Sequence, residues 1–572
     1  MDLRKTKIFL SFKLRRISKI LDSIFFQIKS FFQKLIGAFR ILPIWEKRII
    51  VSLFLIFIIG LVFLARDIYF KNTKVAPTMG GNISFAQVGE AKLINPLFAK
   101  SSQDKDITNL VFSGLFYQNE KRELAPDLVK KWEISEDKKS YTFHLSPKAV
   151  WHDGVPLTAD DLIFTASLIS DPNYSGPLRG LFENVILERV DDYTLKFILQ
   201  ESYAPFLSSL TFGILPAHIL SNIPLEEMEE NEFNLSPIGA GPYKIKETNL
   251  TSKKKQIVLE RNPEHPRRAP LVSEITFKFY DDFERVLKAY NSGEVAALAD
   301  IPHNYFEKVS QTKDLNTYKL SPSSYMVLFF NLENKTLQDK SVREAVAAGI
   351  DKDKIIQEAI LGQGEKVIGP FLPDFDFLGY TDEVKKIDYN PEAARSALEK
   401  KKSLVFDLVV GEDEESLKIA ELIKNQLAEI GVEINIISAD ALSIQTDYIF
   451  PRKYDLLLFG ENLGADPDPF PFWHSSQIGA GKLNFSNFKN SEVDALLEEA
   501  RTNDDWVFRK ERYEKFQKII AEEVPAIFLF RPIEHFAVNN NVKDIKDVKV
   551  VTCSDKFYQI YNWYIKIGRE KK

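Results

Sequence analysis

The sequence is poor in the residues that build cross-links and metal clusters. Cys553 is the one cysteine among 572 residues, so no intrachain disulfide, CxxC redox pair or thiolate zinc cluster can form. The seven histidines do not stand at metal-ligand spacings. We therefore expect no resident metal ion and no cofactor.

The motifs of several common enzyme classes are also missing. The sequence contains no GxSxG elbow, HExxH pair, GxxxxGK[ST] phosphate loop or GxGxxG fingerprint. Two glycine-containing fragments, 362–364 (GQG) and 479–482 (GAGK), lack the remaining residues of those motifs. No period of 20 to 50 residues recurs, which argues against a solenoid or propeller. We expect a protein that is not an enzyme.

Charge is distributed unevenly along the chain. Residues 1–48 hold 12 lysines and arginines against three acidic residues, a net charge of +9, whereas the whole chain carries −6. The remainder therefore carries −15. Nucleic-acid-binding proteins usually place their basic excess on the folded domain, so no nucleic-acid partner is expected.

A long apolar run follows this basic leader. Residues 49–65 (IIVSLFLIFIIGLVFLA) contain no charge, and with residues up to 70 the run approaches the roughly 20 residues that cross a bilayer. A buried core helix and a cleaved signal peptide are the alternatives, but the run lacks a clean A-x-A cleavage pattern. We predict an uncleaved transmembrane signal anchor at 49–70, with residues 1–48 cytoplasmic and the main body extracytoplasmic, either periplasmic or at the cell surface. Residues 8–42 either lie flat on the inner leaflet or form an unstructured basic tail.

Periodicity in the body predicts an α/β fold. After a linker predicted at 71–81, a strand-like run begins at Asn82. Residues 403–410 read as a strand, 413–430 as a helix, 432–437 as a second strand and 454–459 as a third. This βαβ pattern predicts a mostly parallel sheet covered by helices, and ligands of such sheets bind beyond the carboxyl ends of the strands.

The loop after the third predicted strand, 460–475, is the leading candidate site. Its acidic and aromatic residues would offer an ion partner and ring faces to a positively charged ligand group. Catalysis by an Asp466–Asp468 pair is an alternative, although Asp-Pro is also common turn chemistry. Tyr243 follows a flexible pair of glycines and a rigid proline at 239–242, as a chain crossing or strand entrance needs. The candidate ligand-binding residues are Glu461, Asp466, Asp468, Trp473, His474 and Tyr243.

Several motifs occur together in a specific order. They are DLVKKWEIS at 127–135, YTFHL at 141–145, WHDG with PLTADD over 151–161, GAGPY at 239–243, ERNP at 260–263, FNL at 330–332, SVREAVAAGID at 341–351, and the DPDP loop that leads into WHSSQ. From about Asn82 to Lys566 the chain resembles the family 5 solute-binding proteins, the peptide and nickel receptors of bacterial ABC importers.

The resemblance implies a two-lobed periplasmic-binding fold of type II with an extra subdomain. Lobe one would comprise 82–323 plus 531–572, with a subdomain inserted at about 118–203, and lobe two would comprise 324–530. The implied function is a membrane-tethered receptor that captures oligopeptides between the lobes and delivers them to the permease and ATPase subunits of an ABC importer. The alternatives are another solute, such as a nickel chelate or sugar, and a surface carboxylate-dependent hydrolase.

Two positions depart from the family pattern. Peptide-binding members often carry an aspartate, just before the Asp-Pro or Glu-Pro of this loop, that binds the ligand's amino terminus; Leu463 stands at the matching position, with Glu461 nearby. Lipoprotein members carry a cysteine at the signal cleavage site, which this chain lacks. The transmembrane helix would therefore provide the tether.

Overall fold

The computed structural model describes residues 34, 37, 41–119, 123–251, 254–401 and 404–571. The chain forms two units, residues 1–76 with 567–572, and residues 77–566. Most of the predicted basic leader, and with it most of the segment 8–42 considered for the membrane surface, lies outside the described residues.

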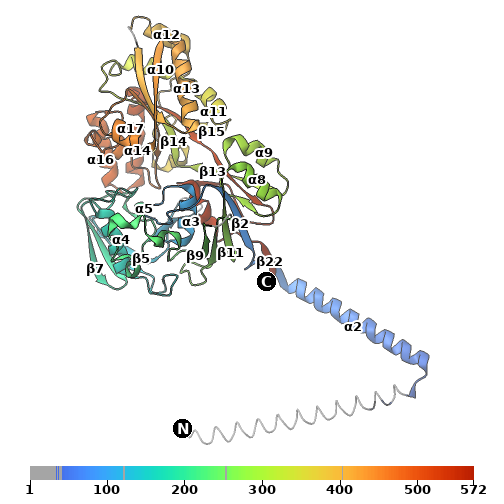
Figure 1. The fold of residues 1–572 in the computed structure, drawn as a ribbon. Helices are drawn as coiled ribbons and strands as arrows, with labels where there is room; N and C mark the ends of the chain where they lie inside the picture. Colours follow the sequence, from blue (N-terminus) through green and yellow to red (C-terminus); the bar gives the residue numbers. More distant parts are fainter. Residues whose placement is uncertain are drawn as a thin grey trace. The chain divides into compact units, whose positions relative to one another are not determined.

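The first unit contains the apolar helix α2 (Ile44–Asn72; Figure 1). Its most apolar 18-residue window has a mean hydropathy of 2.8, and none of that window is buried against protein. The helix begins five residues before the predicted span. Beyond it, residues 73–78 are strand β1 (Thr73–Thr78), paired with β22 (Lys566–Lys571), where a linker was predicted. The Arg569 guanidinium donates to the Thr73 hydroxyl and carbonyl, both at 2.9 Å.

The second unit contains two large sheets (Figure 1). The first has eight strands and, with its attached subdomain, forms what we call lobe one. Strands β2 and β11 run parallel at its centre, and β2 begins at Asn82 as predicted. In spatial order its strands are β21 (Val548–Val550), β13 (Leu315–Pro322), β20 (Glu534–Asn539), β12 (Ala297–Leu298), β2 (Asn82–Val88), β11 (Glu274–Tyr280), β10 (Gln256–Arg261) and β9 (Tyr243–Asn249).

A four-stranded antiparallel sheet within residues 129–199 forms the subdomain of lobe one. Its order is β5 (Val129–Ile134), β6 (Ser140–Leu145), β8 (Thr194–Leu199) and β7 (Val185–Asp191). Helix α4 (Ala159–Ser170) begins at a capping box, where the backbone N–H of Thr158 donates to the Asp161 carboxylate at 2.8 Å. The same carboxylate accepts from the backbone N–H of Ala217 at 2.9 Å.

The second large sheet has six strands and forms lobe two. The predicted βαβ unit is confirmed by β16 (Leu404–Gly411), α13 (Glu414–Glu429) and β17 (Val432–Ala439), with β18 (Leu456–Asn462) also parallel to β16. The prediction that the sheet is mostly parallel is wrong, because β14 (Ser324–Phe330), β19 (Ala526–Pro532) and β15 (Gly364–Lys366) all pair antiparallel. Strands β14 and β19 enter and leave the lobe directly from lobe one, without the helical crossover that parallel neighbours need.

Helices cover both faces of the lobe two sheet. Alternate residues of β14 serve two cores: Leu328 and Phe330 pack on one side, Val327 and Phe329 on the other. Asp or Asn side chains cap the helices that cover these cores, accepting backbone N–H groups at their first turns. These helices are α10 (Lys340–Ala348), α11 (Lys352–Ala359), α12 (Pro391–Leu398), α13, α16 (Ser491–Thr502) and α17 (Trp506–Glu523).

The chain passes between the two large sheets at two neighbouring places. Strand β13 ends at Pro322 and β14 begins at Ser324, while β19 ends at Pro532 and β20 begins at Glu534. Single residues, Ser323 and Ile533, therefore separate strands that belong to different sheets. These crossings lie close to the boundaries predicted at 323/324 and 530/531.

Candidate functional site

A cavity of about 830 Å³ lies between the two lobes. Its lobe two wall is the loop after β18 together with the end of α16, which places it beyond the carboxyl ends of the parallel strands β16 and β18. Lobe one supplies the opposite wall. The lining includes Lys105 and Asn109 of α3 (Ser102–Val111), parts of segments 177–185 and 199–212, Asp555 and Tyr558 of the 3-10 helix η6 (Cys553–Gln559), and residues 464–466 and 501–502 of lobe two.

Asp466 lines this cavity but is already paired. Its two carboxylate oxygens accept from both terminal nitrogens of Arg509 on α17, at 2.6 and 2.9 Å. The side chains are 8% and 2% exposed, so the bidentate pair is largely shielded from water. The Asp466 carboxylate therefore holds the loop against α17 through this ion pair.

Asp468 is the second acidic residue of the loop and is also neutralised. Its carboxylate lies 3.1 Å from Nε of Arg501 on α16 and accepts the backbone N–H of Phe470 at 3.2 Å. Burial raises the pKa of Asp468, while Arg501 opposes that rise. The hydroxyl of Tyr203, from lobe one, donates to the same carboxylate at 3.4 Å. Asp468 thus joins the lobes instead of facing the cavity.

Arg501 is the centre of this contact between lobes. Its guanidinium lies 4.8 Å from the ring of Tyr203 and 4.3 Å from the ring of Phe470, and its carbonyl accepts the backbone N–H of Ala204 at 2.8 Å. We call Tyr203, Ala204, Asp468 and Arg501 the lobe clasp. It contains residues of both lobes at the edge of the cavity, and a side chain held between two rings in this way is favoured by cation–π attraction.

Three other predicted site residues support the surroundings. Trp473 is fully buried in the aromatic core of lobe two, where it packs on Phe329 and Phe528. Tyr243 is fully buried in lobe one, and its hydroxyl donates to the Val272 carbonyl at 3.0 Å. Both are core residues and not lining residues, because their large apolar rings fill space that the strands around them enclose.

His474 holds the end of the loop. Its Nδ1 lies 2.7 Å from the Ser476 hydroxyl, its Nε2 lies 3.2 Å from the Glu498 carboxylate on α16, and its ring stacks on Phe470 at 4.1 Å. With 7% of its surface exposed, His474 fixes the loop to α16 and does not form a metal centre with its neighbours. Among the described residues, no group of three or more His, Cys, Asp or Glu side chains is placed to hold a metal ion.

Glu461 is the most unusual of the predicted residues. It lies on β18 opposite Tyr325 of β14 and is only 2% exposed. Tyr325 is the polar neighbour of this carboxyl, but its hydroxyl donates to the Pro370 carbonyl at 3.0 Å, so neither Glu461 oxygen accepts a hydrogen bond of good geometry from a described residue. Burial raises the pKa of Glu461 to about 8, so the neutral form predominates at pH 7. A neutral, enclosed carboxyl cannot serve as an ion partner for a ligand.

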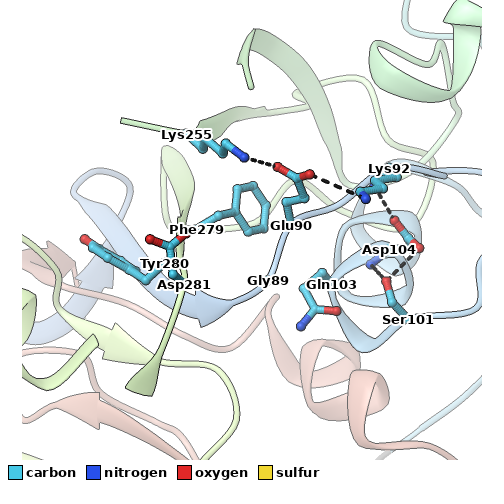
Figure 2. Close-up of a pocket in the computed structure, with 10 residues that line it drawn as sticks. All are labelled: Gly89, Glu90, Lys92, Ser101, Gln103, Asp104, Lys255, Phe279, Tyr280 and Asp281. Atoms are coloured by element: carbon cyan, nitrogen blue, oxygen red, sulfur yellow. Dashed lines mark hydrogen bonds and ion pairs between the residues drawn. The ribbon is translucent and has the colours of Figure 1, made fainter. Parts of the chain in front are cut away.

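A second, smaller cavity of about 480 Å³ lies in lobe one, at the carboxyl ends of β2 and β11 (Figure 2). Figure 2 shows its charged groups facing one another: Glu90 accepts from Lys255 at 2.6 Å and lies 3.6 Å from the Lys92 ammonium. Hydrogen bonding to Lys255 lowers the pKa of Glu90. Because one lobe alone supplies this lining, we assign the candidate site to the cavity between the lobes.

Comparison with known proteins shows that the sequence matches a family of bacterial solute-binding proteins. A sequence model described as "Bacterial extracellular solute-binding proteins, family 5 Middle" matches residues 123–483. The oligopeptide-binding protein AppA of Bacillus subtilis is 28% identical over 519 residues, which covers 86% of this chain and 93% of AppA.

Solved structures agree over the same extent. The structure of B. subtilis AppA in complex with a nonapeptide superposes with a TM-score of 0.71 at 27% identity, covering 86% of this chain and all of AppA. CtaP of Listeria monocytogenes superposes with a TM-score of 0.72 at 26% identity, covering 86% of this chain and all of CtaP. NikZ of Campylobacter jejuni, in complex with Ni(L-His), superposes with a TM-score of 0.69 at 25% identity, covering 84% of this chain and 99% of NikZ.

Proposed function

Because the chain belongs to the bacterial extracellular solute-binding proteins of family 5, we propose that it is a membrane-anchored receptor that captures oligopeptides between its lobes and delivers them to an ABC importer. The observation that carries the proposal is the cavity of about 830 Å³ whose walls come from both lobes. Its volume lies within the range of cavities that bury small ligands. Similarity to AppA, solved with a nonapeptide, favours peptides as the ligand class.

Helix α2 would anchor this receptor to the membrane. It is long enough to cross a bilayer, with 29 residues at about 1.5 Å each, and the basic residues before it favour a cytoplasmic amino terminus. The lobes would then lie outside the membrane, where the permease of an importer receives solutes from extracytoplasmic receptors. Retention of the full-length chain in the membrane fraction after alkaline extraction tests the anchor.

Closure of the lobes would trap the ligand. The two crossings at Ser323 and Ile533 form a natural hinge, because few backbone torsions need to change there for the sheets to rotate apart. The lobe clasp lies at the edge of the cavity and would fasten the closed state. In this proposal Asp466 and Arg501 form part of the cavity wall, while Asp468 and His474 position the loop.

The clasp offers a direct test of closure. Tyr203→Phe keeps the ring over Arg501 and removes the hydroxyl that donates to Asp468, so bound peptide should dissociate about 2- to 10-fold faster, the range expected from one net hydrogen bond. Tyr290→Phe is the matched control, since its hydroxyl donates to the Lys313 carbonyl away from the cavity. Stopped-flow dissociation rates that are equal for the two variants would contradict the clasp.

Native mass spectrometry of the full chain in mild detergent tests the ligand. We expect a series of co-purified masses that match peptides. A single mass that matches a nickel chelate would move the assignment toward the NikZ type of ligand. Failure of a pool of tri-, penta- and nonapeptides to bind the emptied protein would overturn the peptide proposal.

The observed ion pairs do not favour a hydrolase. A general acid and base must be available to substrate, whereas Asp466 is held by Arg509 and Asp468 by Arg501. We propose that the protein binds its ligand without chemical change.

A further inference from the structure

The charged groups around the cavity differ in whether they are already neutralised. In lobe two, Asp466 is paired with Arg509 and Arg501 with Asp468. In lobe one, the Asp555 carboxylate accepts the backbone N–H groups of residues 551 and 552, at 3.1 and 2.8 Å. These groups have little remaining capacity to pair with a ligand charge.

Lys105 is different, because its charge lacks a neutralising partner. It lines the cavity from the first turn of α3 and is half-buried, and no ion pair or hydrogen bond joins its ammonium to another described residue. Asn109, one turn further along α3, lines the same cavity and donates to Asp555 at 3.2 Å. Residues four apart share one face of a helix, so this face of α3 is turned toward the cavity.

A half-buried cation without a counter-ion costs free energy that a ligand anion can recover. Burial removes water from the ammonium, and a charge-assisted hydrogen bond to a carboxylate replaces that hydration. Arg179, the other lining cation outside the clasp, lies exposed on the subdomain, where a contact is screened by solvent. Lys105 is therefore the strongest anion-binding group in the lining.

The lining offers much less to a cation. The carboxylates of the 460–475 loop are paired or, at Glu461, neutral and enclosed. Glu183 and Glu201 line the cavity, but both are exposed, and ion pairs at exposed positions are worth little. Among the described lobe two residues that line the cavity, the amine-binding role predicted for the loop from its composition therefore finds no unpaired carboxylate.

We propose that Lys105 binds the carboxylate of the ligand and that the cavity selects ligands by this group and not by a terminal amine. The inference rests on the proposed function, since it assigns one contact of the peptide within the same cavity. A peptide always carries a carboxyl terminus, so one fixed lysine could orient peptides of different sequence.

Chemically blocked peptides test this directly. The probes are an alanine tripeptide, pentapeptide and nonapeptide, each with one phenylalanine, prepared with free ends, with a carboxyl-terminal amide and with an acetylated amino terminus. Isothermal titration of each into the full chain in detergent gives the affinities. We expect amidation to weaken binding about 10- to 100-fold, the range for a charge-assisted hydrogen bond, and acetylation to change it less than about 3-fold.

Variants assign the effect to the residue. Lys105→Met should bind free and amidated peptides equally, and Lys105→Arg should keep the preference for the free carboxylate. Lys148→Met, an exposed lysine outside the cavity, is the matched control and should behave as wild type. Equal binding of free and amidated peptides by the wild type, or a preference that survives in Lys105→Met, would overturn the inference and leave the peptide receptor intact. If none of the probes binds, the proposed function itself fails.

Discussion

Replacing Asp466 by asparagine should destabilise lobe two strongly. The substitution keeps the shape of the side chain and removes its charge, which leaves the Arg509 guanidinium, 2% exposed, without its counter-ion. Removing one partner of a buried ion pair costs about 3–5 kcal/mol. Because asparagine can still accept one of the two hydrogen bonds of 2.6 and 2.9 Å, we expect about 3 kcal/mol.

Thermal unfolding measures this loss. For a unit of 150–250 residues, each kcal/mol lowers Tm by roughly 2–4 °C, so Asp466→Asn should unfold about 6–12 °C below wild type by circular dichroism. Asp353→Asn is the matched control, since Asp353 pairs with Lys366 at 2.8 Å but is 73% exposed, and such pairs are worth about 1 kcal/mol or less. Equal shifts in the two variants would refute the assignment of a structural ion pair.

A double substitution separates the pair from other effects of the change. Arg509→Met removes the cation as well, so the combination with Asp466→Asn should be less destabilising than the sum of the single changes. The comparison also bears on the hydrolase alternative. Loss of any activity in Asp466→Asn would identify a catalytic carboxylate only if the melting temperature were unchanged.

Two further predictions follow from buried positions. Burial raises the pKa of Glu461 from 4.5 to about 8. The contribution of Glu461 to the free energy of unfolding is therefore full below pH 4.5 and is lost as the pH rises to 8. The total loss over this range is at most about 5 kcal/mol. Glu461→Gln should therefore match wild type near pH 4 and melt higher at pH 9; parallel melting curves from pH 4 to 9 would contradict this. Gly239→Ala should destabilise lobe one by about 1–3 kcal/mol, because the new Cβ would lie 2.0 Å from the Val111 carbonyl oxygen. Gly460→Ala, with open space around the added carbon, is the control for urea unfolding, and equal midpoints would exclude the clash.

The helices and strands of lobe two could be predicted from the sequence because each shows the hydrophobic periodicity of its own type. The apolar run predicted at 403–410 reflects a strand buried on both faces, and the helical spacing before Gly431 reflects a helix buried along one stripe. The structure confirms these elements as β16 and α13. The direction of each strand in the sheet could not be predicted from this periodicity. Strands β14 and β19 read as apolar runs like any buried strand, and only the three-dimensional path through Ser323 and Ile533 makes them antiparallel.

The glycine pair at 239 and 241 shows a similar limit. Flexibility at a chain crossing is a reasonable prediction from GAGPY, yet neither glycine has a positive φ. What requires glycine is close approach, since a Cβ at either position would meet the backbone of Val111 at the end of α3. The neighbour that excludes a side chain lies more than 120 residues away in sequence, so local composition cannot identify it.

The same reasoning explains why the composition of the acidic loop could not show that its aspartates are already paired. Composition showed two aspartates and aromatic rings near a strand end, which is the chemistry of a cation site. The arginines that neutralise them come from α16 and α17, 33 and 43 residues later, and only the fold brings them together. Lys105 belongs to no motif and lies far from the loop in sequence, but among the described lining residues it carries a half-buried charge without an ion pair, whereas Arg179, Glu183 and Glu201 are exposed. In a cleft between two lobes, the groups free to bind a ligand are therefore those that neighbouring helices have not already paired.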